Sequence, residues 1–195
     1  MKKIALLLFI IISSFNNNLL ADDKKIKRIY EGKADAKITI ITYESLTCGH
    51  CADFHNNVYP ELKKDFIDKG LVKIEFRHFP LDIAALNASK IAQCYNDGKS
   101  NLLHILFSNQ KKWAKGETIE ETNEYLKKLL KDKNININFE KCINDKIIED
   151  YVLNDRIEGV KKFKVNATPT IIINDKKFDK SLNYKNLKKS LEKLI

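Results

Sequence analysis

Cysteine is the residue type in this chain with the clearest capacity for chemistry, and the chain has four of them. Two lie in the sequence CGHC at residues 48–51, whereas Cys94 and Cys142 stand alone. A Cys-x-x-Cys spacing brings both sulfurs onto one helical turn, where they can form a disulfide or supply half of a zinc site. Since Cys94 and Cys142 do not make a second such pair, the spacing favours redox chemistry without a metal or a cofactor.

The residues on either side of CGHC predict a strand before it and a helix after it. Residues 37–44 (KITIITYE) are apolar and β-branched, which is typical of a buried strand. Residues 51–69 carry apolar side chains at helical spacing, and Pro60 should kink that helix. Cys48 would then lie at a helix N-terminus, where unpaired N–H groups and the macrodipole stabilise a thiolate.

This placement predicts a different role for each residue of the motif. Cys48 is the expected nucleophile, and Cys51, one turn further in, is the expected thiol that resolves a mixed disulfide. His50 adds a nearby cation or hydrogen-bond donor that favours the thiolate. Each pKa unit is worth about 1.4 kcal/mol, or roughly 30 mV of reduction potential, so these effects push the dithiol toward an oxidant.

The remaining pattern predicts an α/β fold with a helical insertion. Residues 71–79 (LVKIEFRHF) form a second strand, which completes a βαβ unit with a parallel strand pair. Strand patterns return only at 169–174 and 176–178, and an amphipathic helix at 183–195 follows. Between the two parts we expect five helices, at 82–97, 99–111, 118–131, 137–144 and 146–163.

Residues 1–21 have the pattern of a signal peptide. Lys2 and Lys3 precede an apolar run at residues 4–12, and Ala21 offers a small residue at a cleavage point. Export would place the chain in an oxidising compartment, where disulfides persist. Cys94 and Cys142 could then form a structural disulfide, closing a loop of about 49 residues for up to about 4 kcal/mol. The alternative is two buried free thiols.

The chain is basic, with a net charge of +9 over 195 residues. A basic balance can indicate a nucleic-acid partner, but the lysines are scattered along the whole chain without interleaved arginines and aromatics. We therefore expect a solvated, lysine-rich surface and no nucleic-acid partner. Because the sequence shows no obvious extra interface, we also expect a monomer.

Four features together resemble the DsbA-like branch of the thioredoxin superfamily, a group of bacterial periplasmic oxidoreductases. They are the strand–CGHC–helix junction, Pro60 in the first helix, the helical insertion, and the sequence ATPT at 167–170 before the last strand pair. The resemblance spans residues 29–195, and the stretch ESLTCGHC is similar to the enzymes of intracellular alphaproteobacteria. It implies a thioredoxin-like domain at 22–81 and 164–195 with an insertion at 82–163. It also implies a cis bond before Pro169, with Thr168 and Gly49 helping to position substrate.

Two positions depart from the pattern of that family. Gly49 stands where many DsbA proteins have proline, and Gly-His is familiar from disulfide isomerases. The family often places a buried carboxylate six residues before the first cysteine, where this chain has Thr42. Glu44 lies two residues further along and shares the face of Thr42 by strand alternation. Glu44 is thus a candidate proton-transfer group, and the alternative is a solvated glutamate at a strand end.

The resemblance implies an enzyme that introduces disulfide bonds into reduced or unfolded exported proteins through Cys48 and Cys51. A quinone-linked membrane protein of the DsbB type would reoxidise it in the periplasm. Two alternatives remain open: a periplasmic disulfide reductase or isomerase, and a non-catalytic thioredoxin-like module that binds peptides.

Overall fold

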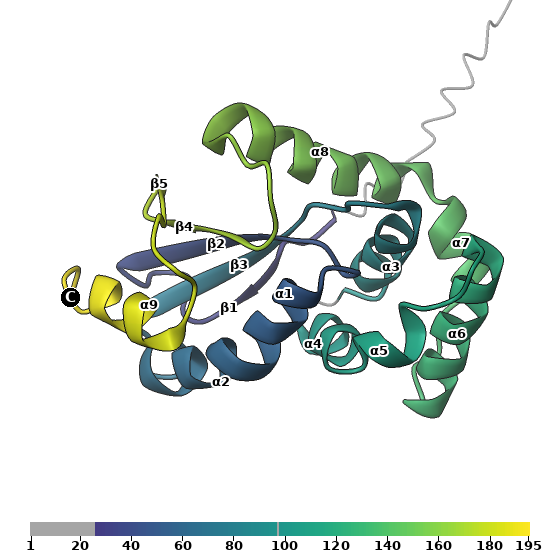
Figure 1. Cartoon of the computed structure of the whole chain (residues 1–195), viewed down its shortest axis with the longest axis horizontal. Coiled ribbons are helices and arrows are strands. Elements are labelled where there is room, and N and C mark those ends of the chain that lie inside the picture. The colour runs from purple at the N-terminus through teal and green to yellow at the C-terminus, as the bar shows by residue number, and fades with distance from the viewer. Residues whose placement is uncertain (1–25, 97) are drawn as a thin grey trace, which may run out of the picture.

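The computed structural model describes residues 26–96 and 98–195, so the predicted signal peptide at residues 1–21 lies outside the described part. A five-stranded sheet has helices packed on both of its faces (Figure 1). In the described part of the chain, no helix is both long enough and apolar enough to span a membrane.

The sheet has the strand order β1-β3-β2-β4-β5. Strands β2 and β3 are parallel, whereas β1 pairs antiparallel with β3, β4 with β2, and β5 with β4. The strands are β1 (Ile29–Glu31), β2 (Ile38–Glu44), β3 (Val72–His78), β4 (Thr170–Ile173) and β5 (Lys176–Lys177). The predicted α/β order βαβ…ββα with inserted helices is confirmed. Strand β1 was not predicted, because three residues give no readable alternation and their pairing comes from β3.

A continuous helical segment follows β2 and alternates between α and π turns. It consists of α1 (Gly49–Asp53), η1 (Phe54–Val58), α2 (Tyr59–Leu62) and η2 (Lys63–Ile67). Pro60 has no N–H to donate, and the turn before it is widened so that the N–H of Tyr59 bonds to the Phe54 carbonyl, five residues back. The chain thus accommodates Pro60 within a helix by means of a π turn.

The helices of the insertion lie between β3 and β4 in sequence. They are α3 (Ile83–Cys94), α4 (Asn101–Ser108), α5 (Gln110–Trp113), α6 (Ile119–Asp132), α7 (Phe139–Asn144) and α8 (Lys146–Phe163). The predicted helix at 99–111 is two helices, α4 and α5, separated at Asn109. Helices α3 to α7 gather beside the sheet, while α8 runs back across one of its faces (Figure 1). The last helix, α9 (Tyr184–Leu191), packs with α2 on the opposite face.

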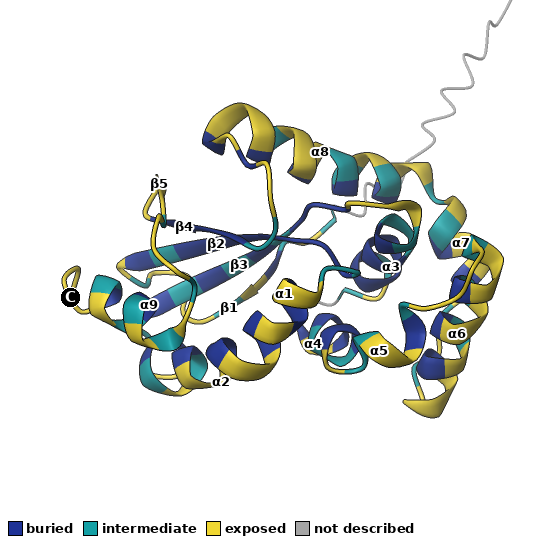
Figure 2. Cartoon of the chain, viewed as in Figure 1, coloured by how far each residue is buried: buried dark blue, intermediate teal, exposed yellow. Residues whose placement is uncertain are grey.

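The two faces of the sheet bury different sets of residues, which follow the alternation along each strand. In β2, Ile40 belongs to the large core shared with the CGHC helix and the insertion. Its neighbour Ile41, together with Tyr43, belongs to a smaller cluster beneath α8. Figure 2 shows the central strands and the inner sides of the helices as the most buried parts of the molecule. Glu44 therefore lies on the face that carries the cysteines.

The structure joins Cys94 at the end of α3 to Cys142 in α7 by a disulfide, with 5.8 Å between the two Cα atoms. This bond connects two helices of the insertion at a sequence separation of 48 residues. It is remote in sequence from the CGHC motif, whose two cysteines are not bridged.

Candidate active site

The two cysteines of the CGHC motif occupy unequal environments. Cys48 is the N-cap residue of α1 and is half-buried, whereas Cys51 lies one turn into the helix and is fully buried. The N–H of Cys51 donates to the Cys48 carbonyl at 3.1 Å, which fixes the first helical turn. Within residues 26–96 and 98–195, no group of three or more His, Cys, Asp or Glu side chains could hold a metal ion.

The environment of Cys48 favours its thiolate and lowers its pKa to about 5. The largest cause is a hydrogen bond from the Cys51 thiol, and it outweighs the opposing effect of partial burial. Backbone N–H groups of His50 and Cys51 also stabilise the thiolate, as expected at a helix N-terminus. This environment therefore favours the thiolate form of Cys48 at neutral pH, and the thiolate is the form that a nucleophilic cysteine requires.

The environment of Cys51 has the opposite effect and raises its pKa far above the ordinary value. Burial is the largest cause, followed by the hydrogen bond to Cys48 and the negative charge of Glu44. A pair with one acidic thiol and one thiol that holds its proton is suited to disulfide exchange, in which an exposed thiolate reacts first and a buried thiol resolves the mixed disulfide.

The loop before β4 faces the dithiol. The Thr168–Pro169 peptide bond is cis, as the resemblance implies, and the Thr168 carbonyl accepts a hydrogen bond from Cys48 Sγ at 3.3 Å. The Thr168 hydroxyl is buried without a partner in this thiol form. It is placed to donate to the Cys48 thiolate, and a hydrogen bond from the Thr168 side chain is one of the contributions that lower the pKa of Cys48.

A hollow beside the dithiol offers space for a substrate. It brings together part of the CGHC helix, the cis-proline loop and the segment before α9. The lining residues are His50, Asp53, Phe54, Asn57, Val58, Thr168, Pro169, Leu182 and Asn183. A hollow with both apolar and polar walls next to a reactive sulfur can accept an extended peptide.

Of the two middle residues of the motif, His50 has an exposed side chain and Gly49 has no side chain. The His50 side chain is 88% exposed, and its Nδ1 lies 4.0 Å from Asp53 Oδ2. Its visible contribution to the Cys48 thiolate is therefore its backbone N–H. A Cβ added at Gly49 would meet nothing within 4 Å, so this position has room for a side chain.

Glu44 lies at the end of β2 and is 4% exposed, unlike a solvated glutamate at a strand end. One of its oxygens, Oε2, lies 2.9 Å from Nε2 of His55 in η1. The other, Oε1, is buried and has no hydrogen-bond partner. The negative charge of Glu44 is one of the causes, after burial and the hydrogen bond to Cys48, that raise the pKa of Cys51.

Two contributions to the site were not found from sequence. The Gln110 amide in α5 donates to the carbonyls of Leu46 and Cys48, at 2.8 Å and 3.0 Å, and so holds the loop before α1. His55 and His104 are hydrogen-bonded to each other, with 2.9 Å between their Nδ1 atoms. No local spacing reveals either contact, since each joins segments more than 45 residues apart.

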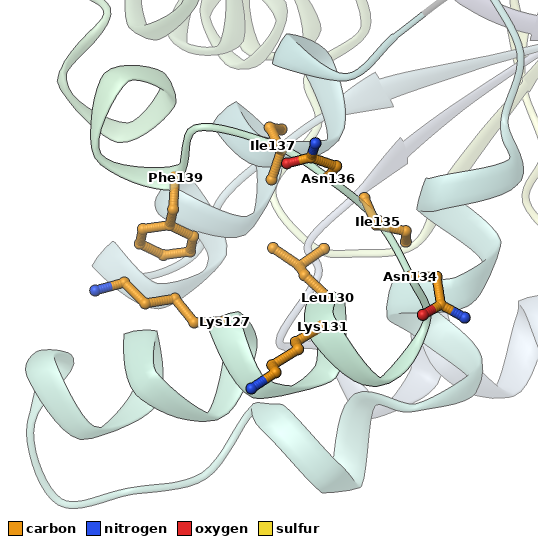
Figure 3. A pocket seen from close by; sticks show the side chains of 8 residues that line it. All are labelled: Lys127, Leu130, Lys131, Asn134, Ile135, Asn136, Ile137 and Phe139. Atoms are coloured by element: carbon orange, nitrogen blue, oxygen red, sulfur yellow. The ribbon is translucent and has the colours of Figure 1, made fainter.

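A second hollow lies in the insertion, away from the dithiol (Figure 3). It is formed by the end of α6, the segment that follows it and the start of α7. Its walls are Lys127, Leu130, Lys131, Asn134, Ile135, Asn136, Ile137 and Phe139. The Lys127 ammonium lies over the Phe139 ring, 5.0 Å from the ring centre. The residues that line this second hollow include no cysteine and no histidine.

Comparisons with known proteins agree with this fold. The thioredoxin family model matches residues 24–193 of the chain. The crystal structure of Wolbachia pipientis alpha-DsbA1 is similar with a TM-score of 0.77 and 32% identity, over 86% of this chain and 90% of that one. BdbD from Bacillus subtilis is similar with a TM-score of 0.69 and 25% identity, over 86% and 92%.

Curated relatives give the same assignment. A Rickettsia bellii protein that is named as a protein-disulfide oxidoreductase is 32% identical over 73% of this chain. This chain spans 55% of that protein's length. Disulfide bond formation protein D of Bacillus subtilis is 28% identical over 83% of this chain and 74% of its own length. The chain belongs to the DsbA-like thiol:disulfide oxidoreductases of the thioredoxin superfamily.

Proposed function

We propose that this chain introduces disulfide bonds into exported proteins by dithiol–disulfide exchange through Cys48 and Cys51. The observation that carries the proposal is the contrast between the two thiols. Cys48 is accessible at a helix N-terminus with a pKa of about 5, and Cys51 is buried with a raised pKa. A stabilised thiolate favours the dithiol form, and a protein that favours its own dithiol form gives up its disulfide readily.

In the proposed cycle, the oxidised protein carries a Cys48–Cys51 disulfide. A substrate thiolate attacks Cys48 Sγ, a mixed disulfide forms, and Cys51 leaves as a thiolate that takes up a proton. A second thiolate of the substrate attacks the substrate sulfur of the mixed disulfide and displaces Cys48. The substrate has then lost two electrons to the dithiol, and Cys48 remains a thiolate at neutral pH.

The cis-proline loop is the proposed substrate platform. Pro169 carries no N–H, and the backbone of Thr168 lies against Cys48 Sγ. An extended segment of an unfolded substrate that binds in the adjacent hollow would bring its own cysteine to Cys48. Gly49, next to Cys48, carries no side chain, and the space that a Cβ would occupy there is open.

The proposed setting is the periplasm. The signal-peptide pattern at residues 1–21 supports export, and a disulfide between Cys94 and Cys142 suits an oxidising compartment. Each donation leaves the dithiol reduced, so the cycle needs an oxidising partner, which we propose to be a membrane protein of the DsbB type. We further propose a monomer that works on reduced, unfolded exported proteins.

The test is to mix the oxidised protein with a reduced, unfolded ribonuclease and to follow disulfide formation by thiol trapping and mass. We expect one substrate disulfide for each protein molecule reduced, and none with Cys48→Ser. The reduction potential is measured beside it in glutathione buffers. A potential near about −120 mV, the value of a strong oxidant, supports the donor, whereas one near about −270 mV, the value of thioredoxin, would make the protein a reductase.

A further inference from the structure

A hydrogen-bonded chain of four side chains runs from the buried carboxylate of Glu44 to the protein surface. Glu44 Oε2 lies 2.9 Å from His55 Nε2, His55 Nδ1 lies 2.9 Å from His104 Nδ1, and His104 Nε2 lies 2.9 Å from Glu31 Oε1. These residues come from four separate elements: β2, η1, α4 and β1. Each contact is within ordinary hydrogen-bond distance, so the chain is unbroken.

Counting protons shows that these contacts can conduct them. Two ring nitrogens bond only if one is protonated, so the His55–His104 contact holds one proton and each histidine–carboxylate contact holds another. Three protons therefore fill three contacts. All three hydrogen bonds remain in place whether the proton between Glu44 and His55 is on the carboxyl group or on the imidazole ring. A proton can move along such a chain without breaking any contact.

Packing fixes the two rings in this arrangement. The His55 ring stacks on Phe107 with 4.0 Å between ring centres, and the His104 ring stacks on Tyr59 at 4.4 Å. The π turn before Pro60 carries His55 and places it over the face of the sheet where β2 ends. π turns are uncommon and are often found at functional positions.

The inner and outer ends of this series of hydrogen-bonded side chains differ in solvent exposure, as a proton path to solvent requires. The Glu44 and His55 side chains are 4% and 2% exposed, whereas Glu31 and His104 are 18% and 25% exposed. The inner end terminates in Glu44 Oε1, a buried oxygen with no hydrogen-bond partner. Cys51 is the buried group on this side whose protonation must change in each cycle.

We propose that Glu44, His55, His104 and Glu31 form a proton relay that carries protons between Cys51 and solvent. This inference rests on the proposed function, because it requires Cys51 to take part in exchange. When a mixed disulfide on Cys48 is resolved, the Cys51 thiol gives its proton to Glu44, and the outer end of the relay releases one proton to solvent. The Cys51 thiolate attacks Cys48 Sγ, the 48–51 bond forms, and the partner leaves as a thiolate.

Other titratable groups face the relay and set its protonation. Tyr59 and Ser100 donate hydrogen bonds to Glu31, and with His104 they hold the pKa of Glu31 at about 2 against the effect of burial. The outer end therefore stays an acceptor through the neutral range. The further charged or titratable groups near the relay are Lys63 beside Glu31, and His78 and the two cysteines near Glu44.

The test separates the two cysteines by their kinetics. Reduced protein is mixed with increasing glutathione disulfide, and quenched samples are analysed by mass. The rate at low concentration measures attack by Cys48, and the plateau at high concentration measures resolution by Cys51. General acid–base groups contribute typically about 10²–10⁴-fold, and a relay with a solvent bypass contributes less, so we expect His104→Gln to lower the plateau by roughly 10-fold. The low-concentration rate should stay unchanged.

Three further variants distinguish a relay from a structural role. In His104→Ala, added imidazole should restore the plateau by filling the gap with a diffusible proton carrier. In Glu44→Gln, the block lies on the inner side, so imidazole should have no effect. The double variant Glu44→Gln/His104→Gln should be no slower than Glu44→Gln alone, because both act on one path. His78→Asn, a buried histidine outside the relay, is the matched control and should show no imidazole effect.

Two results would overturn the relay: a plateau that His104→Gln leaves unchanged, or a parallel loss of both rates that imidazole does not restore. If the chain performed no exchange at all, the low-concentration rate of the unsubstituted protein would itself be absent. Failure of the relay and failure of the proposed function therefore give different results.

Discussion

The reduction potential of the 48–51 pair should depend on pH with a break near pH 5. The pKa of Cys48 falls from an ordinary 9.0 to about 5, and that of Cys51 is raised beyond the working range. Above about pH 5, reduction of the disulfide by two electrons takes up one proton, and the potential should fall by about 30 mV per pH unit. Below that pH it takes up two protons, and the slope should steepen to about 60 mV per unit.

The same ionisation stabilises the reduced form. Since the pKa of Cys48 is lowered, this stabilisation is fully present above pH 9.0 and is lost as the pH falls through about 5. At pH 7, two units above the pKa of about 5, the stabilisation of the reduced form corresponds to two pKa units. After a discount for solvent screening of the half-exposed sulfur, this is about 1–2 kcal/mol. This corresponds to about 20–45 mV of oxidising strength.

The assay combines glutathione titrations from pH 4 to pH 8 with the ultraviolet absorbance of the thiolate. Cys51→Ala removes the hydrogen bond that is the largest cause of the shift, and the thiolate transition should move upward by one unit or more. A slope of about 60 mV per unit between pH 5 and pH 8 would refute the reasoning, because Cys48 would then be a thiol. A transition that stays near pH 5 in Cys51→Ala would assign the shift to the backbone N–H groups instead.

Three further predictions concern the frame of the site. Replacing both Cys94 and Cys142 by alanine should lower the free energy of unfolding by up to about 4 kcal/mol in urea, and leave the rate of attack by the reactive thiolate unchanged. Gly159→Ala places a Cβ 2.7 Å from a buried aromatic ring and should cost about 1–2 kcal/mol, whereas Gly49→Ala, which meets open space, should change stability by less than about 0.5 kcal/mol. Thr168→Val removes the unpartnered hydroxyl beside the thiolate, so the thiolate absorbance should titrate at a higher pH, and an unchanged titration would exclude the hydroxyl as a donor.

Most of the frame could be predicted because it follows from local patterns. The run at 37–44 reads as a buried strand, and the structure places β2 at Ile38–Glu44. The helix boundaries after residue 82 follow from helical spacing with caps such as Asp145, whose side chain accepts from the N–H groups of Ile147 and Ile148. The cis bond before Pro169 came from family resemblance, since sequence physics alone favours a trans bond there.

What could not be predicted depends on contacts between distant segments. Strand β1 is too short to show a pattern, and only its pairing with β3 defines it. His55 and His104 lie 49 positions apart, and a lone histidine in a helical pattern gives no sign of a partner. Strand alternation predicts the face of the sheet on which Glu44 lies, but it does not predict that His55 is its hydrogen-bond partner.

The alternation along β2 divides its side chains between two different cores. Glu44 faces the cysteines and the histidines, while its neighbour Tyr43 packs beneath α8 with Phe79 and Phe163. Adjacent residues of one strand thus serve two purposes: Tyr43 fills the core beneath α8, and Glu44 brings a buried carboxylate to the side of the cysteines. Substitutions beneath α8 act first on the packing of that core, and substitutions around Glu44 act first on the charges beside the dithiol. A designer could likewise tune one property from each side of a single strand.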